Sequence, residues 1–303
     1  MNKGRFEDIV SVIYAFAARN AGRTVLIAAA VVLFDVTAVG CVVRDLRPAP
    51  ARLYFLDVGQ GDSELVVFPD GVKMLVDGGP LNGGAYKTLG SILPPEDRSI
   101  DVVMMSHPEV DHYGGLVEIA RRYRIGVFVS NGEESASESF KALARELDVA
   151  RVPKAVLRAG DRILHGGDAF TVLSPARPGT GGTTNDDALV GDLTLSGARI
   201  FFAADADGSV ESAVLGTWSE PVDVLKVTHH GSKYGTTAAF LAATSPKTAV
   251  IEVGKNSYGH PAPETLARLD AAGTKVFRTD QDGTLEFAIA NGSMRVFSIP
   301  VIE

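Results

Sequence analysis

The sequence predicts an α/β domain over residues 51–303. Apolar runs of strand length, rich in Val, Ile and Phe, alternate there with segments whose apolar residues have helical spacing, at 115–123, 137–147 and 263–272. Such alternation is typical of α/β folds. A segment of this length can bury roughly 70–75% of its unfolded surface, which is sufficient for a real core.

The first strand-to-helix turn to consider spans residues 106–115, Ser-His-Pro-Glu-Val-Asp-His-Tyr-Gly-Gly. The apolar run 102–105 precedes it, and the glycines open the predicted helix over 115–123. Four potential ligands stand within six residues: His107, Glu109, Asp111 and His112. At a strand end such side chains can face one cation. A single histidine is more often an ordinary loop residue, but the cluster favours a metal site.

Three further predicted strands end in the same way. The strand over 198–204 leads to Asp205, the next leads to the pair His229 and His230, and a third leads to a loop with His260. Rigid scaffolds hold functional sites on such loops. Asp205 could instead cap a helix over 208–218, and the histidine pair could form a hydrogen-bonded turn. Four such strand ends favour one shared site.

In order and type, these motifs resemble the metallo-β-lactamase superfamily, and more closely the hydrolase domain of ComEC-type DNA-uptake proteins. The resemblance runs from about Leu53 to Val296. Beyond the turns above, it rests on Asp77-Gly78-Gly79 and on the segments 56–63, 225–232, 256–261 and 277–283. It implies an αββα four-layer sandwich and a metal-dependent hydrolase.

The resemblance also implies roles for individual residues. One ion would be held by His107, Asp205 and Glu109, and a second by Asp111, His112, Asp205 and His229, so that Asp205 bridges the two. The candidate catalytic residues are Asp111, His230 and His260, with His230 lying behind the ligands or facing substrate and His260 contacting phosphate or protonating a leaving group. Asp77 would orient the ligands, and Asn185 and Asp186 would line the mouth. Asp57 and Asp62 either satisfy backbone donors of a Gly-rich turn or belong to the site.

The chain departs from the superfamily pattern at three places. Glu109 stands where the second histidine is expected, the middle histidine is missing, and Ala204 replaces the usual glycine before Asp205. Carboxylate-rich sites favour Mn²⁺ or Mg²⁺ relative to Zn²⁺. We therefore expect two divalent ions, Zn²⁺ or Mn²⁺, with Mg²⁺ as a further candidate.

The expected chemistry is hydrolysis by a metal-activated water. Two nearby ions can activate water and stabilise the oxygens of a displacement at phosphorus. No Ser-His-Asp set is evident, and the single cysteine, Cys41, lies outside the domain. A phosphodiesterase or nuclease is the leading prediction. The alternatives are hydrolysis of a lactone, thioester or β-lactam, and a non-catalytic envelope module with a decayed site.

Residues 1–50 form a separate segment. The apolar stretch 24–43 is long enough to span a bilayer of about 30 Å, and Asp35 interrupts it. More basic residues precede than follow it, which predicts a membrane anchor with the hydrolase on the extracytoplasmic side. A cleaved or lipidated signal at Cys41 and a buried helix are the alternatives.

Charge argues against tight, non-specific DNA binding. The chain carries −8. Residues 1–50 hold six basic and four acidic side chains, so that residues 51–303 carry −10. A protein that grips a long polyanion usually presents a basic face. A phosphodiester or another small hydrolysable molecule is the expected substrate, and nucleic acid stays open.

Overall fold

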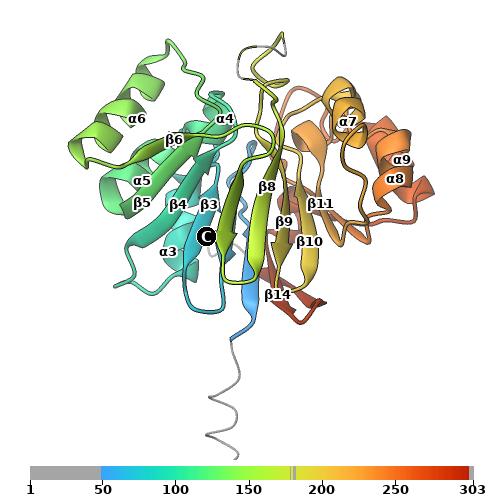
Figure 1. The fold of residues 1–303 in the computed structure, drawn as a ribbon, viewed down its shortest axis with the longest axis horizontal. Coiled ribbons are helices and arrows are strands. Elements are labelled where there is room, and N and C mark those ends of the chain that lie inside the picture. Colours follow the sequence, from blue (N-terminus) through green and yellow to red (C-terminus); the bar gives the residue numbers. More distant parts are fainter. Residues whose placement is uncertain (1–48, 178, 180–181, 300–303) are drawn as a thin grey trace, which may run out of the picture. The chain divides into compact units, whose positions relative to one another are not determined.

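Two β-sheets form the centre of the domain in this computed structural model, which describes residues 49–177, 179 and 182–299 (Figure 1). Within these residues the first sheet has eight strands, in the order β15 (Ser293–Ile299), β14 (Thr284–Ala290), β1 (Ala51–Phe55), β2 (Glu64–Val67), β3 (Lys73–Val76), β4 (Ser99–Met105), β5 (Arg124–Ser130) and β6 (Lys154–Val156). The second has seven, in the order β13 (Lys275–Arg278), β12 (Thr248–Ile251), β11 (Val224–Lys226), β10 (Ala198–Phe202), β9 (Val190–Leu195), β8 (Asp168–Ser174) and β7 (Arg162–His165).

Helices cover the outer face of each sheet, which completes the expected α/β/β/α layers. The first sheet carries α3 (Gly84–Ile92), α5 (Leu116–Arg122) and α6 (Glu138–Val149). The second carries α7 (Gly208–Leu215), α8 (Ala238–Thr244) and α9 (Pro263–Ala271). Single turns form at α4 (Val110–Tyr113), η1 (Thr228–Gly231) and α10 (Thr279–Asp282). The three helices predicted from apolar spacing are thus confirmed, with ends that differ by one or two residues.

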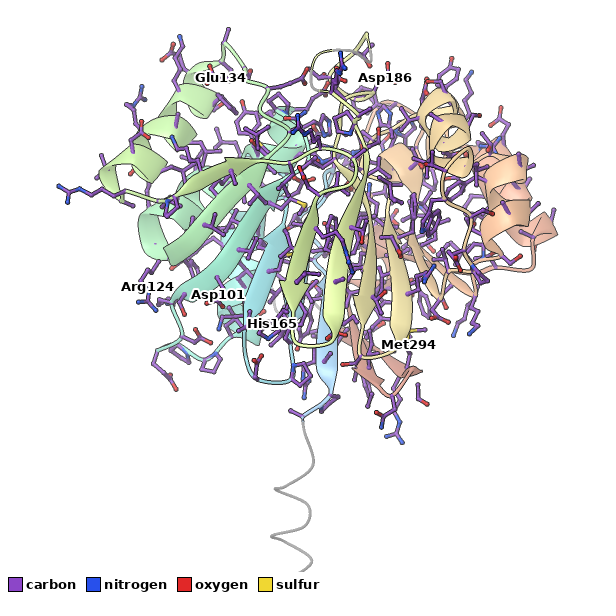
Figure 2. The ribbon with its side chains drawn as sticks, viewed as in Figure 1. Asp101, Arg124, Glu134, His165, Asp186 and Met294 are labelled. Carbon is purple, nitrogen blue, oxygen red and sulfur yellow. The ribbon has the colours of Figure 1, made fainter. Side chains whose placement is uncertain are left out.

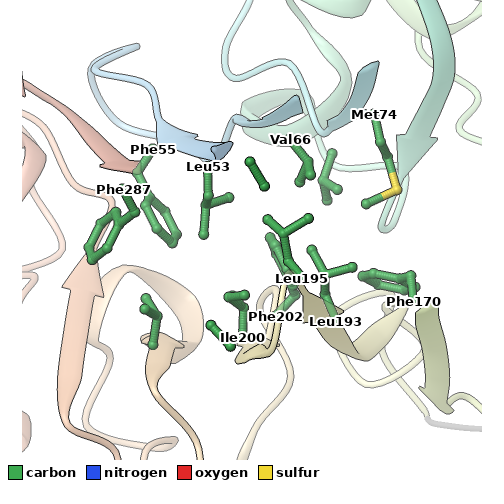
Figure 3. Close-up of a cluster of buried hydrophobic side chains, with 14 of the residues drawn as sticks. Leu53, Phe55, Val66, Met74, Phe170, Leu193, Leu195, Ile200, Phe202 and Phe287 are labelled. Carbon is green, nitrogen blue, oxygen red and sulfur yellow. The ribbon is translucent and has the colours of Figure 1, made fainter. Parts of the chain in front are cut away.

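The central core fills the space between the sheets, as Figure 3 shows. Successive side chains of a strand point to opposite faces. Leu53 and Phe55 of β1 therefore join Leu193 and Ile200 of the second sheet, whereas Tyr54 packs on the helix side. Full burial of each large apolar side chain contributes about 1.5–3 kcal/mol. This layer fixes the two sheets against each other.

Strand direction explains why the predicted ligands can meet. β3, β4 and β5 run parallel in the first sheet, and β10, β11 and β12 run parallel in the second. The carboxyl ends of parallel strands share one edge of a sheet. In Figure 2, Glu134, which follows β5, and Asp186 lie at one end of the domain, whereas Asp101, Arg124 and His165 lie at the other. His165 ends β7 at the hairpin that leads to β8.

The proposed membrane anchor at 24–43 lies outside the described residues. Among the helices that the structure does describe, none is long and apolar enough to cross a bilayer. Residues Pro50–Glu303 form one unit.

Candidate metal centre

Four side chains from three strand ends converge at the carboxyl-end edges of both sheets. Asp111, His112, Asp205 and His230 each place one ligand atom within 4.8 Å of the others. Asp205 Oδ2 lies 3.3 Å from His112 Nε2 and 3.6 Å from His230 Nε2. His230 Nε2 also lies 3.4 Å from Asp111 Oδ2. These are two imidazoles and two carboxylates, a set suited to a divalent cation.

Hydrogen bonds to Nδ1 turn both imidazoles so that Nε2 faces the cluster. His112 Nδ1 donates to Asp77 Oδ2 at 2.8 Å, and His230 Nδ1 donates to the carbonyl of Glu252 at 2.9 Å. Asp77 is itself fixed, because it also accepts from the backbone N–H and the hydroxyl of Ser106. Contacts of this kind set the tautomer and direction of metal-binding histidines. The predicted orienting role of Asp77 therefore has a structural basis.

Several buried polar atoms at this place have no hydrogen-bond partner within the described protein. They are Nε2 of His107, His112 and His230 and Oδ1 of Asp205. Buried polar groups in proteins are nearly always satisfied, so orphaned atoms that face one another call for an explanation. A divalent cation accounts for them, because it would take the Nε2 and carboxylate lone pairs as ligands. The residues present thus fit a metal ion.

The electrostatics of the protein without an ion point the same way. Burial raises the pKa of Asp205, but His230 and His112 outweigh it and hold that pKa well below its usual value. Burial lowers the pKa of His230, yet Asp205 and Asp62 raise it to about 10. His107 differs, because burial and then the charge of His112 lower its pKa to about 3. Protonated imidazoles thus balance the carboxylates, and a cation can replace those protons.

Left-handed backbone places three residues of the site. Ala204, His229 and His230 have φ angles of 46°, 46° and 53°. This conformation costs residues other than glycine roughly 1–2 kcal/mol each. Such strain clusters at functional sites, where the surrounding structure holds it. At position 204, where the superfamily pattern has glycine, the alanine of this chain adopts the left-handed conformation.

His107 and Glu109 border the four-residue group without belonging to it. His107 is buried with its ring 4.1 Å from that of His112, and its Nδ1 lies 2.9 Å from Ser106 Oγ. Glu109 precedes α4 and accepts a hydrogen bond of 2.8 Å from Thr184 Oγ1. Its carboxylate is thus engaged by the 183–187 segment. A second ion held by His107, Glu109 and Asp205 stays a prediction.

The two neighbouring histidines of the β11 turn point in different directions. His230 is 1% exposed and belongs to the group. The side chain of His229 is 35% exposed, and although its Nε2 lies 3.4 Å from Asp205 Oδ2, it is outside the group. The sequence reasoning gave the ligand role to His229. The geometry adds His230 as a candidate ligand, and the ligand role of His229 stays a prediction, since its Nε2 also approaches Asp205.

The other predicted residues divide between the mouth and the scaffold. The ring of His260 lies 5.4 Å from that of His229, and burial lowers its pKa, as do the charges of His229 and His230. Asp186 accepts from Thr183 in the segment that contacts Glu109 and also includes Asn185. Asp57 accepts from the N–H of Gly59, the turn role already considered for it. Asp207, and not Asp205, caps α7, which leaves Asp205 free for the site.

Behind the ligands lies a buried charge network of which sequence reasoning named only Asp62. Lys226 Nζ forms an ion pair with Asp62 and donates to the carbonyl of Ala204 at 3.0 Å. Asp62 Oδ1 lies 3.2 Å from His230 Nδ1, so Asp62 belongs to the site. Glu64 and Glu252 lie within 4.8 Å of Asp62, and the three carboxylates come from both sheets. Charged residues inside apolar strands were the available signal.

The chain is similar in sequence to two curated bacterial proteins. The chain is 29% identical over 257 residues to ComE operon protein 3 of Bacillus subtilis, which covers 78% of this chain and 33% of that protein. It is 28% identical over 250 residues to competence protein ComA of Neisseria gonorrhoeae, covering 82% and 33%. The chain thus spans about a third of the length of these curated relatives.

Solved structures with little sequence identity share the fold. The metallo-beta-lactamase fold protein YhfI of Bacillus subtilis superposes with a TM-score of 0.54 at 12% identity, covering 78% of this chain and 99% of that one. The diiron beta-hydroxylase CmlA of Streptomyces venezuelae gives 0.53 at 15% identity, covering 84% and 55%. The metallo-beta-lactamase family model matches residues 56–254, which include every member of the four-residue group. The chain therefore belongs to the metallo-beta-lactamase superfamily.

Proposed function

We propose that this protein is a metal-dependent phosphodiesterase that acts on nucleotides or nucleic acid. The observation that carries the proposal is the group of Asp111, His112, Asp205 and His230, whose ligand atoms lie within 4.8 Å of one another. A divalent cation held there would supply an activated water and stabilise charge at phosphorus. A second cation at His107 and Glu109 belongs to the same proposal.

The residues around this group would bind substrate and move protons. His229 and His260 lie on its more open side, with their rings 5.4 Å apart. Because the pKa of His260 is lowered, its imidazole is neutral near neutral pH and can accept a proton. The neutral form favours a general-base role for His260 beside the predicted phosphate contact and leaving-group protonation. Asp111 is partly exposed and can orient a water molecule beside His230.

The mouth carries aromatic and basic side chains suited to a phosphate with an attached base. Tyr258 is 75% exposed, with its ring 5.9 Å from that of His260. Tyr234 is 70% exposed and lies under the ammonium of Lys233 at 5.1 Å. Exposed aromatics stack on bases, and nearby lysines attract the backbone. These features support a nucleotide-like substrate, although the domain carries −10 overall.

The test begins with metal content. Protein freed of metal by chelation is reloaded with Mn²⁺, Zn²⁺ or Mg²⁺, analysed for bound ions, and assayed with bis-p-nitrophenyl phosphate and then with single- and double-stranded DNA. Bound metal with metal-restored turnover supports the proposal. Bound metal with turnover only on a lactone, thioester or β-lactam would refute the phosphodiesterase. A protein that binds no metal would refute the hydrolase altogether.

His165→Ala is the matched control for His230→Ala in this assay. It removes an imidazole at the opposite end of the domain, where His165 contacts Asp70 on the surface. We expect His165→Ala to keep its metal and its turnover, whereas His230→Ala loses both.

We further propose that the domain works at the cell envelope, on the extracytoplasmic side. The apolar stretch 24–43 and the similarity to proteins named for competence support this placement. Protease added to intact spheroplasts should then degrade the domain. Protection until the membrane is lysed would contradict the proposed orientation.

A further inference from the structure

The turn that carries His230 is built from unfavourable backbone conformations. It runs from Thr228 to Thr237, between β11 and α8. Within it, His229, His230 and Thr236 are left-handed, the last with a φ of 50°. A β-branched residue in this region is a true outlier. Something outside the turn must hold it in this shape.

Glu211 of α7 accepts hydrogen bonds from donor groups of the turn. This carboxylate is only 4% exposed and accepts from the hydroxyl of Thr228 at 3.1 Å. It also accepts from the backbone N–H of Thr236 and, at 2.9 Å, from that of Thr237. Hydrogen bonds to a charged acceptor are stronger than neutral ones. Glu211 thus forms hydrogen bonds with residues at both ends of the turn.

Arg268 of α9 donates hydrogen bonds to carbonyl groups of the same turn. Its guanidinium donates to the carbonyls of Thr236 at 2.9 Å, Gly235 at 2.8 Å and Lys233 at 3.1 Å. The planar guanidinium offers several donors in a fixed geometry, which a lysine cannot do. Glu211 on α7 therefore binds the N–H groups of one strained turn, while Arg268 on α9 binds its carbonyl groups. We call this pair the clamp.

We propose that Glu211 and Arg268 are positioning residues that preorganise His230 for the metal ion. The inference rests on the proposed metal centre. An imidazole already fixed in place loses little freedom when it binds an ion, so a clamped turn raises metal affinity. Neither residue contacts the four-residue group, and both act through the backbone of the turn. Residues that orient ligands typically change metal affinity 10- to 100-fold when replaced.

The experiment uses Glu211→Gln and Arg268→Ala in the full chain. Glu118→Gln and Arg121→Ala are the matched controls, because Glu118 and Arg121 form surface ion pairs on α5. Mn²⁺ affinity is measured by competition with a chromophoric chelator. Hydrogen exchange of the metal-free proteins is followed peptide by peptide. We expect Mn²⁺ to bind about 10- to 100-fold more weakly to both clamp variants. Exchange should accelerate in residues 228–237 and stay unchanged in the sheets.

Different outcomes separate this inference from simpler ones. Unchanged Mn²⁺ affinity despite faster exchange in the turn would overturn the positioning role. Faster exchange throughout the domain would show a general loss of stability and also overturn it. Arg268→Ala keeps the test decisive if Glu211→Gln does not fold, because its guanidinium is only partly buried. A wild-type protein without Mn²⁺ affinity would refute the metal centre itself and this inference with it, whereas the exchange rates would still report whether the clamp holds the turn.

Discussion

Lys226→Met tests whether the charge of Lys226 compensates the buried charge of Asp62 behind the ligands. Lys226 and Asp62 are both 1% exposed, and their direct contact is the nearest opposite charge that each has. Methionine has a similar volume but no charge, so Asp62 would keep only the contacts with His230 at 3.2 Å and His112 at 3.7 Å. Breaking a buried pair by removing one partner costs about 3–5 kcal/mol.

The double variant Asp62→Asn/Lys226→Met makes the reasoning quantitative. It removes both charges. The losses that remain are the hydrogen bond to the carbonyl of Ala204, worth about 1 kcal/mol, and the weaker charge contacts of Asp62 with His230 and His112 and of Lys226 with Asp205. We therefore expect the double variant to be more stable than Lys226→Met alone. Urea unfolding in the presence of EDTA measures this, with the single tryptophan, Trp218, as the fluorescent probe and far-UV circular dichroism as a second. EDTA removes the contribution of bound metal.

One result would refute the argument. If the free energy lost by the double variant equals the sum of the two single losses, within about 0.5 kcal/mol, then Asp62 and Lys226 do not compensate each other. The ion pair would then be incidental to the stability of the site.

Three further predictions follow from the site and its surroundings. Asp205→Asn should abolish metal-dependent activity and metal binding while circular dichroism stays unchanged, because Asp205 lies between both histidines of the group; substantial residual hydrolysis would remove its central role. His230→Ala should lower the metal content measured by elemental analysis more than His229→Ala, and the opposite ranking would restore the ligand role to the exposed neighbour. Burial raises the pKa of Asp97, but Lys73 outweighs burial and leaves that pKa below the usual 3.8. The Lys73–Asp97 pair therefore stabilises the fold above about pH 4, and this stabilisation is lost as pH falls through the folded-state pKa. Asp97→Asn should therefore show a smaller acid-induced loss of unfolding free energy than wild type, and an equal loss would exclude the pair as its source.

Much of the fold and part of the site could be read from local pattern. Apolar periodicity predicted the helices, because a helix that packs on a sheet has apolar residues on its buried face, and these recur about every 3.6 residues along the chain. The turns after β4 and β10 indicated His112 and Asp205, since both turns follow apolar strands. A strand end is a local property, and the sequence reports it without knowledge of the partner strands.

Side-chain direction within a turn could not be read in this way. His229 and His230 are adjacent and chemically identical, both have left-handed φ angles, and yet His230 is buried while the side chain of His229 is 35% exposed. Glu211 and Arg268 contact this turn from distant helices. No spacing rule contains that information.

By itself, the sequence determined an α/β domain with metal-binding residue types at four strand ends, because periodicity and residue chemistry are carried by each segment separately. The tertiary structure alone decided that His230 is buried within the group, and that Glu109 accepts a hydrogen bond from Thr184. It also brought Asp62, from the loop between β1 and β2 of one sheet, against Lys226 of β11 in the other. These features depend on how two sheets pack and how a turn is clamped, and a charge is stable in such an interior only when a partner arrives from elsewhere in the chain.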